Sequence, residues 1–128
     1  MNDPLRAHLN QKHVLVVDDE DICLMVTASL LESLGAEVST FDNAEQALRF
    51  CRNNAAFVDL VICDLHMPGL NGTELASALR HAGLECPIIG FSGDHTAHKG
   101  SEHRALPLVV SKPLQPDELL QALQGLHD

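Results

Sequence analysis

Four short runs of largely apolar residues, each followed by a polar residue, set the hydrophobic pattern of this chain. Each run is rich in Val, Ile and Leu, which is typical of strands buried on both faces of a parallel sheet. Parallel sheets bind ligands at the carboxyl ends of their strands, so neighbouring strands would gather the polar residues in one pocket. The runs cover residues 14–17, 60–63, 87–91 and 108–111, and they lead into Asp18 and Asp19, Asp64, Ser92 and Lys112 respectively.

Between these runs the apolar residues recur at the spacing of amphipathic helices. Gly35 can end the first helix, and Pro116 can occupy the first turn of the last. Asn43 followed by Gln46 resembles a capping box at the start of the second helix. Together with a short strand at 38–41, this alternation predicts one α/β domain with a five-stranded parallel sheet. The predicted helices cover residues 22–34, 44–52, 73–81 and 116–126.

Two segments lack this periodicity. Residues 1–12 are polar and are expected to be a loose tail or an extra turn ahead of a domain over 13–126. Residues 94–104 have almost no apolar side chain to bury, so a fourth helix should be short, irregular or missing. The three histidines of this segment have a loosely zinc-like spacing, but a polar surface loop explains them better because no Cys or carboxylate completes a site. They are His95, His98 and His103.

The composition narrows the class of protein. The chain has 128 residues, enough for one domain, and a formal net charge of -10 argues against a nucleic-acid-binding surface. No apolar stretch is long enough to span a membrane, and no signal peptide is evident, so we expect a cytoplasmic protein. The four cysteines show no CxxC spacing and fall in apolar segments, which favours reduced core thiols over disulfides or metal sites.

The polar residues at the strand ends suggest a specific chemistry. Taken singly, each acid could be an ordinary turn residue. Gathered together, carboxylates repel one another unless a cation neutralises them, and Mg²⁺ suits a site with few carboxylates and phosphate oxygens. Aspartate can accept a phosphoryl group, and lysine can hold a phosphate. The set therefore predicts a site for a hard divalent cation and a phosphoryl group.

Four separated motifs occur in an order that resembles the receiver domain of bacterial response regulators. The motifs cover residues 14–20, 63–72, 91–93 and 111–114. Several motifs in the right order are far more specific than any one alone. The resemblance spans roughly residues 13–126 and implies a flavodoxin-like (CheY-like), doubly wound fold.

The resemblance also implies a role for each acidic residue of the site. Asp64 would be the phosphoacceptor. Asp19 and Asp64 would bind Mg²⁺ directly, together with the backbone carbonyl of His66. Asp18 would contact the metal through a bound water.

The remaining site residues would act on the phosphoryl group. Ser92 resembles the switch hydroxyl, and Lys112 would pair with Asp64 before the reaction and with the phosphoryl group afterwards. The bond before Pro113 is expected to be cis, as in relatives. One position departs from the family pattern, because Val109 stands where Tyr or Phe usually forms the second half of the switch. Output through the usual surface is therefore in question.

The main functional hypothesis is a phosphorylation-controlled signalling module, either stand-alone or part of a hybrid kinase or multidomain regulator. A histidine kinase or histidine phosphotransfer protein would donate the phosphoryl group, and the downstream target is unknown. Apart from catalysing its own phosphorylation and dephosphorylation, the chain would not be an enzyme. An adaptor that keeps the fold without the chemistry is the alternative. An aspartyl phosphatase fits less well because His66 replaces its second aspartate, and no GxGxxG motif indicates a dinucleotide.

Overall fold

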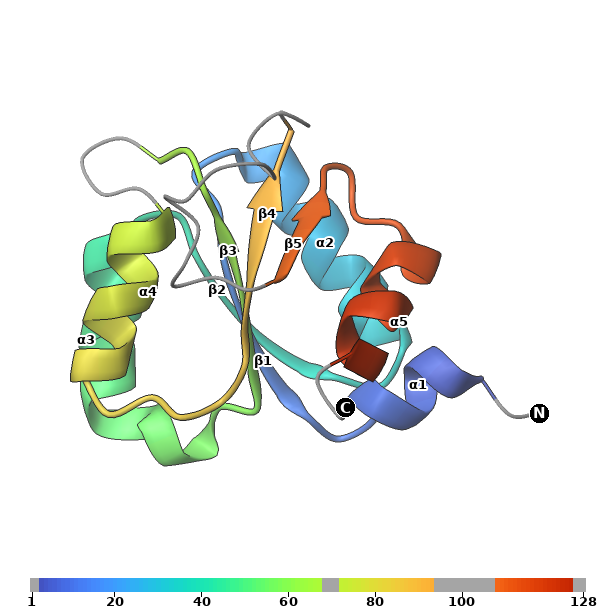
Figure 1. Cartoon of the computed structure of the whole chain (residues 1–128), viewed down its shortest axis with the longest axis horizontal. Coiled ribbons are helices and arrows are strands. Elements are labelled where there is room, and N and C mark those ends of the chain that lie inside the picture. Colours follow the sequence, from blue (N-terminus) through green and yellow to red (C-terminus); the bar gives the residue numbers. More distant parts are fainter. Residues whose placement is uncertain (1–2, 68–71, 94–107, 126–128) are drawn as a thin grey trace.

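Five parallel strands form the centre of the molecule, and helices cover both faces of the sheet (Figure 1). The computed structural model describes residues 3–67, 72–93 and 108–125. The strand order is β2-β1-β3-β4-β5, and each neighbouring pair is parallel. The predicted five-stranded α/β fold is confirmed. The strands are β1 (His13–Val17), β2 (Glu37–Phe41), β3 (Leu60–Asp64), β4 (Ile88–Ser92) and β5 (Leu108–Ser111).

The helices lie in two layers, as Figure 1 shows. One face of the sheet carries α2 and α5, with the short α1 packed against α5. The other face carries α3 and α4, which contact each other. The helices are α1 (Pro4–Leu9), α2 (Asp21–Ser33), α3 (Ala44–Asn54), α4 (Gly72–His81) and α5 (Pro116–Gly125), and a 3₁₀ turn η1 (Ala55–Phe57) follows α3.

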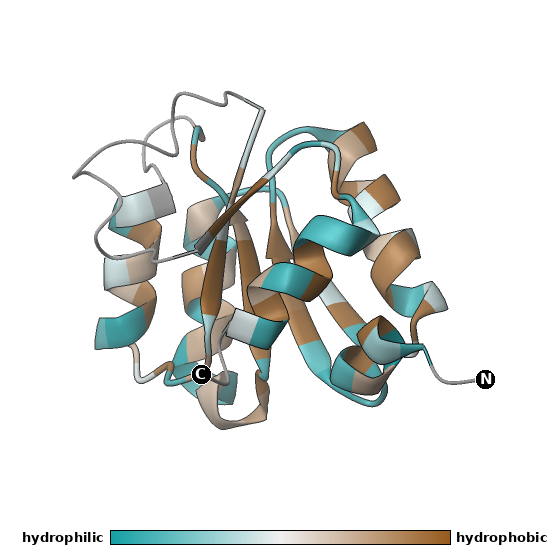
Figure 2. Ribbon diagram, turned by 45° about the vertical axis from the view of Figure 1, so that its right-hand side comes forward, coloured by the Kyte–Doolittle hydropathy of each residue, from teal (hydrophilic) through white to brown (hydrophobic). Residues whose placement is uncertain are grey.

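Strand β1 is buried on both of its faces, which is why its apolar run is continuous rather than alternating. Val14 and Val16 belong to the core beneath α2 and α5, whereas Leu15 and Val17 belong to the core beneath α3 and α4. All four side chains are fully buried. Each contributes about 1.5–3 kcal/mol of burial free energy, so both layers hold the central strand in place. In Figure 2 the strands are mostly hydrophobic, while the helices carry both hydrophilic and hydrophobic residues.

Residues 4–9 form a helix, so the expectation of a loose tail is wrong for them and the alternative of an extra turn is correct. Asp3 caps the helix by accepting a hydrogen bond from the Leu5 amide at 3.0 Å. Leu5 and Leu9 are buried against the α2–α5 layer, in the same core cluster as Leu123. These two leucines stand four residues apart, and Asp3 followed by Pro4 is a common helix start, so the segment carried helical signals despite its polar composition.

The remaining element ends follow the sequence signals closely. The Gln46 amide donates to the Asn43 side chain at 2.9 Å, which makes Asn43 the N-cap of α3 and forms one of the two hydrogen bonds of a capping box. The Lys112–Pro113 peptide bond is cis, as the family resemblance implied. Two predictions, the short fourth helix and the loop with three histidines, lie outside the described residues. Among the described residues, no helix is long and apolar enough to cross a membrane.

The cysteines are free, as expected. Cys51 and Cys63 are fully buried, and Cys23 and Cys86 are partly buried. Burial raises the pKa of the Cys86 thiol to about 11. A thiol with such a pKa is almost wholly protonated at neutral pH, so it behaves as a small core residue rather than a nucleophile.

Gly35→Ala should destabilise the fold more than Gly83→Ala. Both glycines have positive φ, 91° and 103°. A Cβ at Gly35 would collide with the Asn10 Oδ1 atom, whereas nothing lies within 4 Å of a Cβ at Gly83. We expect losses of about 2 and about 1 kcal/mol respectively, measured from urea unfolding. Equal losses would show that Asn10 moves aside without cost.

Candidate functional site

The strand register brings the predicted site residues to one edge of the sheet. Asp64 pairs with Phe91, and Ser92 pairs with Ser111, so β3, β4 and β5 end side by side. Hydrogen bonds continue one residue beyond the strands: the Asp18 amide donates to Phe41 O at 3.0 Å, and the Lys112 amide donates to Ser92 O at 2.8 Å. The sheet therefore fixes the backbone positions of Asp18 and Lys112.

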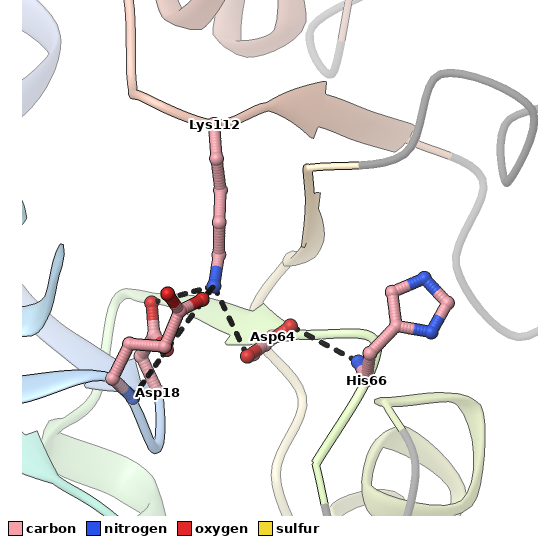
Figure 3. Close-up of polar contacts among 5 residues, drawn as sticks. Asp18, Asp64, His66 and Lys112 are labelled. Atoms are coloured by element: carbon pink, nitrogen blue, oxygen red, sulfur yellow. Dashed lines mark hydrogen bonds and ion pairs between the residues drawn. The ribbon is translucent and has the colours of Figure 1, made fainter.

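The carboxylates of Asp18 and Asp64 are oriented by the same kind of turn. The Glu20 amide donates to Asp18 Oδ1 at 3.0 Å, and the His66 amide donates to Asp64 Oδ1 at 3.0 Å (Figure 3). In each turn the carboxylate accepts from the amide two residues further on. The second oxygen of each carboxylate is left to face the site.

Lys112 lies over this pair of carboxylates (Figure 3). Its Nζ is 3.1 Å from Asp64 Oδ2 and 3.2 Å from Asp18 Oδ1. Its shortest contact, 2.8 Å, is with Glu20 Oε1. The lysine side chain is 12% exposed and its Nζ lies 5.4 Å from the centroid of the Phe91 ring. The ammonium is thus enclosed by three carboxylates and an aromatic face.

The environment moves the pKa values of the acids in different directions. Burial favours protonation of Asp64, but hydrogen bonds from the His66 amide and Lys112 outweigh it and hold its pKa below the usual range. Burial raises the pKa of Asp18 despite Lys112. Desolvation and the nearby Asp64 carboxylate raise the pKa of Asp19. The site therefore keeps Asp64 ionised at neutral pH while carrying more negative charge than Lys112 offsets.

The acidic residues fit a divalent cation. Asp18 Oδ2 is buried and receives no hydrogen bond of good geometry from the described residues, although Lys112 Nζ lies 3.1 Å away. Carboxylate oxygens of Asp18, Glu20 and Asp64 come within 4.8 Å of one another and could hold a metal ion. Oxygen donors are the ligands that Mg²⁺ prefers. A cation here would satisfy the buried oxygen and offset the repulsion.

The structure places the predicted ligands differently from one another. Asp19 is exposed and is not one of the three acids that converge within 4.8 Å, but its side chain is close enough to Asp64 for that carboxylate to raise the pKa of Asp19. The His66 side chain is exposed and its ring points away from Asp64 in Figure 3. Ser92 is buried at the end of β4, beside β3. The metal roles of Asp19, of Asp18 through water and of the His66 carbonyl, and the switch role of Ser92, stay predictions.

Glu20 is the site residue that the sequence reasoning did not single out. It lies at the end of the first motif, residues 14–20, directly after Asp18 and Asp19. It stands at the N-cap of α2, where Glu is not favoured, and its side chain makes no capping hydrogen bond. Only the structure shows this, because the sequence pattern places the start of that helix at residue 22. A residue that breaks a local rule beside a functional site often serves that site.

Fold and site together define a flavodoxin-like α/β domain with an acidic, lysine-containing site at the carboxyl edge of its sheet. The family model of the response regulator receiver domain matches residues 14–124. The chain belongs to this family, which confirms the resemblance found in the motifs.

Relatives with this domain include regulators and kinases. The chain is 37% identical over 123 residues to the two-component response regulator ARR2 of Arabidopsis thaliana, covering 92% of this chain and 18% of ARR2. It is 32% identical over 112 residues to the sensor histidine kinase RcsC of Salmonella typhi, covering 86% and 12%. The chain thus spans less than a fifth of the length of these curated relatives.

Solved structures show the same fold. The receiver domain of the histidine kinase CKI1 from Arabidopsis thaliana, crystallised with Mg²⁺, superposes with a TM-score of 0.81 at 27% sequence identity. The match covers 93% of this chain and 94% of that one. The same CKI1 domain was also crystallised with Mg²⁺ and BeF₃⁻.

Proposed function

We propose that this chain is a phosphorylation-dependent receiver that accepts a phosphoryl group on Asp64 in the presence of Mg²⁺. The observation that carries the proposal is the Asp64 carboxylate itself. It is buried at the end of β3, its pKa is held low, and its Oδ2 faces the Lys112 ammonium at 3.1 Å. An ionised carboxylate beside a fixed cation is suited to attack phosphorus and to hold the product. CKI1 crystals with Mg²⁺ and BeF₃⁻ support the same use of this site.

The proposed reaction uses each of the predicted site residues. An Asp64 oxygen forms a bond to phosphorus while the bond from phosphorus to a donor histidine nitrogen breaks, and the imidazole leaves. Asp19, Asp64 and the His66 carbonyl would hold Mg²⁺, with Asp18 acting through a bound water. A cation held there would offset charge on the phosphoryl oxygens. Lys112 then binds a phosphoryl oxygen, and the Ser92 hydroxyl donates to another.

The first experiment supplies a small-molecule phosphodonor. Incubation with acetyl phosphate and Mg²⁺ should add one phosphoryl group, seen by intact mass, and should shift backbone amides around the site. Omission of Mg²⁺ should prevent the gain. No gain while Mg²⁺ still shifts the amides would favour the second candidate, an adaptor that a partner recognises without phosphorylation. The aliphatic Val109 in place of an aromatic switch residue is what favours that candidate.

A face beside the site fits the proposed donor. Ile22, Met25 and Val26 of α2 are 78%, 66% and 56% exposed, although they are large and apolar. Ile22 and Val26 border a groove of about 830 Å³ that Lys112 and Leu114 also line. Lys112 both lines this groove and contacts Asp64, so the apolar face lies beside the proposed acceptor. We propose that the donor is a histidine kinase or histidine phosphotransfer protein that lays an apolar helix surface here, and that the site passes its signal to a further protein partner.

Ile22→Glu should slow phosphorylation by the protein donor without affecting the phosphorylation chemistry at Asp64. A charge at this apolar contact should slow transfer from a phosphorylated histidine phosphotransfer protein about 30-fold, the effect of losing one interface hot spot. Phosphorylation by acetyl phosphate should stay unchanged, because Asp64 and Lys112 are untouched. Phe57→Glu is the matched control, since Phe57 is 69% exposed but lies in η1, before β3. Equal slowing by both variants would place the donor elsewhere.

A further inference from the structure

Lys112 uses its three N–H donors on three carboxylates that differ sharply in exposure. The side chains of Asp18 and Asp64 are 0% and 4% exposed. That of Glu20 is 66% exposed, and yet it makes the shortest contact, at 2.8 Å. The ammonium therefore bridges three carboxylates whose oxygens could hold a cation, two of them buried and the third, Glu20, at the rim.

The backbone directs Glu20 towards Lys112. The Glu20 amide donates to Asp18 Oδ1, and this hydrogen bond holds the Glu20 backbone next to the buried acid. At the N-cap of α2 its own side chain caps nothing and is free to reach the lysine. The helix does not need this glutamate, so its contact with Lys112 explains its place.

A divalent cation and the Lys112 ammonium compete for the same oxygens. Both are positive, and both need Asp64, while Asp18 has a buried oxygen that receives no hydrogen bond from the described part of the chain. When a cation binds, the ammonium must give up part of its buried contacts and is repelled from the metal. Glu20 is the one partner among the three that lies outside the buried pair.

We propose that Glu20 is a positioning residue that retains Lys112 at the rim of the site while a divalent cation occupies the buried carboxylates. The inference rests on the proposed function in one respect, the binding of a cation beside Asp64. Glu20 is 66% exposed and Lys112 is 12% exposed, so water screens this pair more than the two buried pairs and it is the easiest of the three to open. An arriving phosphoryl oxygen can therefore take the ammonium from Glu20 without moving a buried charge.

The test follows the lysine side chain directly. The chain has three lysines, so ¹³C-lysine labelling gives few signals to assign. With saturating Mg²⁺ and no phosphodonor, the Lys112 Cε should stay ordered in the wild type and become mobile in Glu20→Gln. Glu20→Asp keeps the charge but shortens the arm, and it should behave like Glu20→Gln. Asp21→Asn removes a neighbouring exposed charge and should leave Lys112 ordered.

Mg²⁺ affinity gives a second measurement. Glu20→Gln and Glu20→Asp should weaken Mg²⁺ binding about threefold in amide-shift titrations, the size expected for an exposed ion pair. Asp21→Asn should change it less, and thermal melting without metal should show all variants folded. An ordered Lys112 in Glu20→Gln would overturn the proposal, and so would wild-type behaviour of Glu20→Asp. Because no phosphodonor is present, these results can be read even if Asp64 is never phosphorylated.

Discussion

Asp64→Asn should abolish the phosphoryl gain from acetyl phosphate. The amide that replaces the carboxylate is not a competent nucleophile, and it lacks the charge that Lys112 contacts at 3.1 Å. The fold should survive, because the oxygen of the new side-chain amide can still accept the hydrogen bond that the His66 amide donates to Asp64 Oδ1. Intact mass after incubation with Mg²⁺ measures the effect. Continued labelling of the variant would move the acceptor to another residue.

Asp42→Asn is the matched control for this result. Asp42 directly follows β2, so it occupies the same edge of the sheet as Asp64 and is also an aspartate. It is exposed, and its carboxylate accepts a hydrogen bond from the Asn43 side chain, which an amide oxygen can replace. The control should be phosphorylated like the wild type. Loss of labelling in both variants would point to a general charge effect rather than to one acceptor.

Lys112→Ala should destabilise the metal-free fold by about 3 kcal/mol at neutral pH, because it leaves two buried carboxylates without their cation. Hydrogen bonds from the His66 amide and from Lys112 hold the pKa of Asp64 below its usual range, so the ionised Asp64 stabilises the wild-type fold above its unfolded pKa, and Lys112 supplies part of that stabilisation. That stabilisation is lost as pH falls through the folded pKa. The cost of the substitution should accordingly shrink in acid. Urea unfolding at neutral and acid pH measures both values.

Binding of Mg²⁺ should restore the stability that Lys112→Ala loses. Mg²⁺ affinity should stay largely intact, since the carboxylates remain and a competing cation is removed. Phosphorylation of this variant, however, should no longer shift the backbone amides around Ser92. Lys112→Met keeps an unbranched aliphatic side chain but removes the ammonium, and it should show the same loss, which isolates the charge. A strong loss of Mg²⁺ affinity would contradict the role assigned to the lysine. Full stability of Lys112→Met would show that the stem, not the ammonium, matters.

Much of the fold was readable from local patterns. Strand β1 is buried on both faces, so its apolar run is continuous, and a continuous run is visible in sequence. Gly35 and Asn43 mark helix ends through backbone conformation and capping, which depend on a few neighbouring residues. The same holds for α1 in hindsight: Leu5 and Leu9 carried the signal, but its stability comes from packing on α5, which the segment does not reveal.

Some residues of the candidate site could also be predicted from the sequence, whereas the role of Glu20 could not. Asp18, Asp64 and Lys112 could be chosen from sequence because each ends a predicted strand and because parallel strands share one carboxyl edge. The part played by Glu20 could not, since it depends on a contact between positions 92 residues apart. No local pattern encodes a side chain reaching across to another strand end.

The sequence by itself therefore determined the order of strands and helices, the family, and the residues gathered at the sheet edge. The tertiary structure alone decided how these residues share charge: which Asp18 oxygen receives no hydrogen bond from the described residues, why Asp64 stays ionised, and that Glu20 contacts Lys112. The physical reason is the range of the forces involved. Hydrophobic periodicity depends on residues that are near one another along the chain, so it can be read from the sequence. Ion pairs depend on distances of about 3 Å between side chains, and only the packed fold sets those distances.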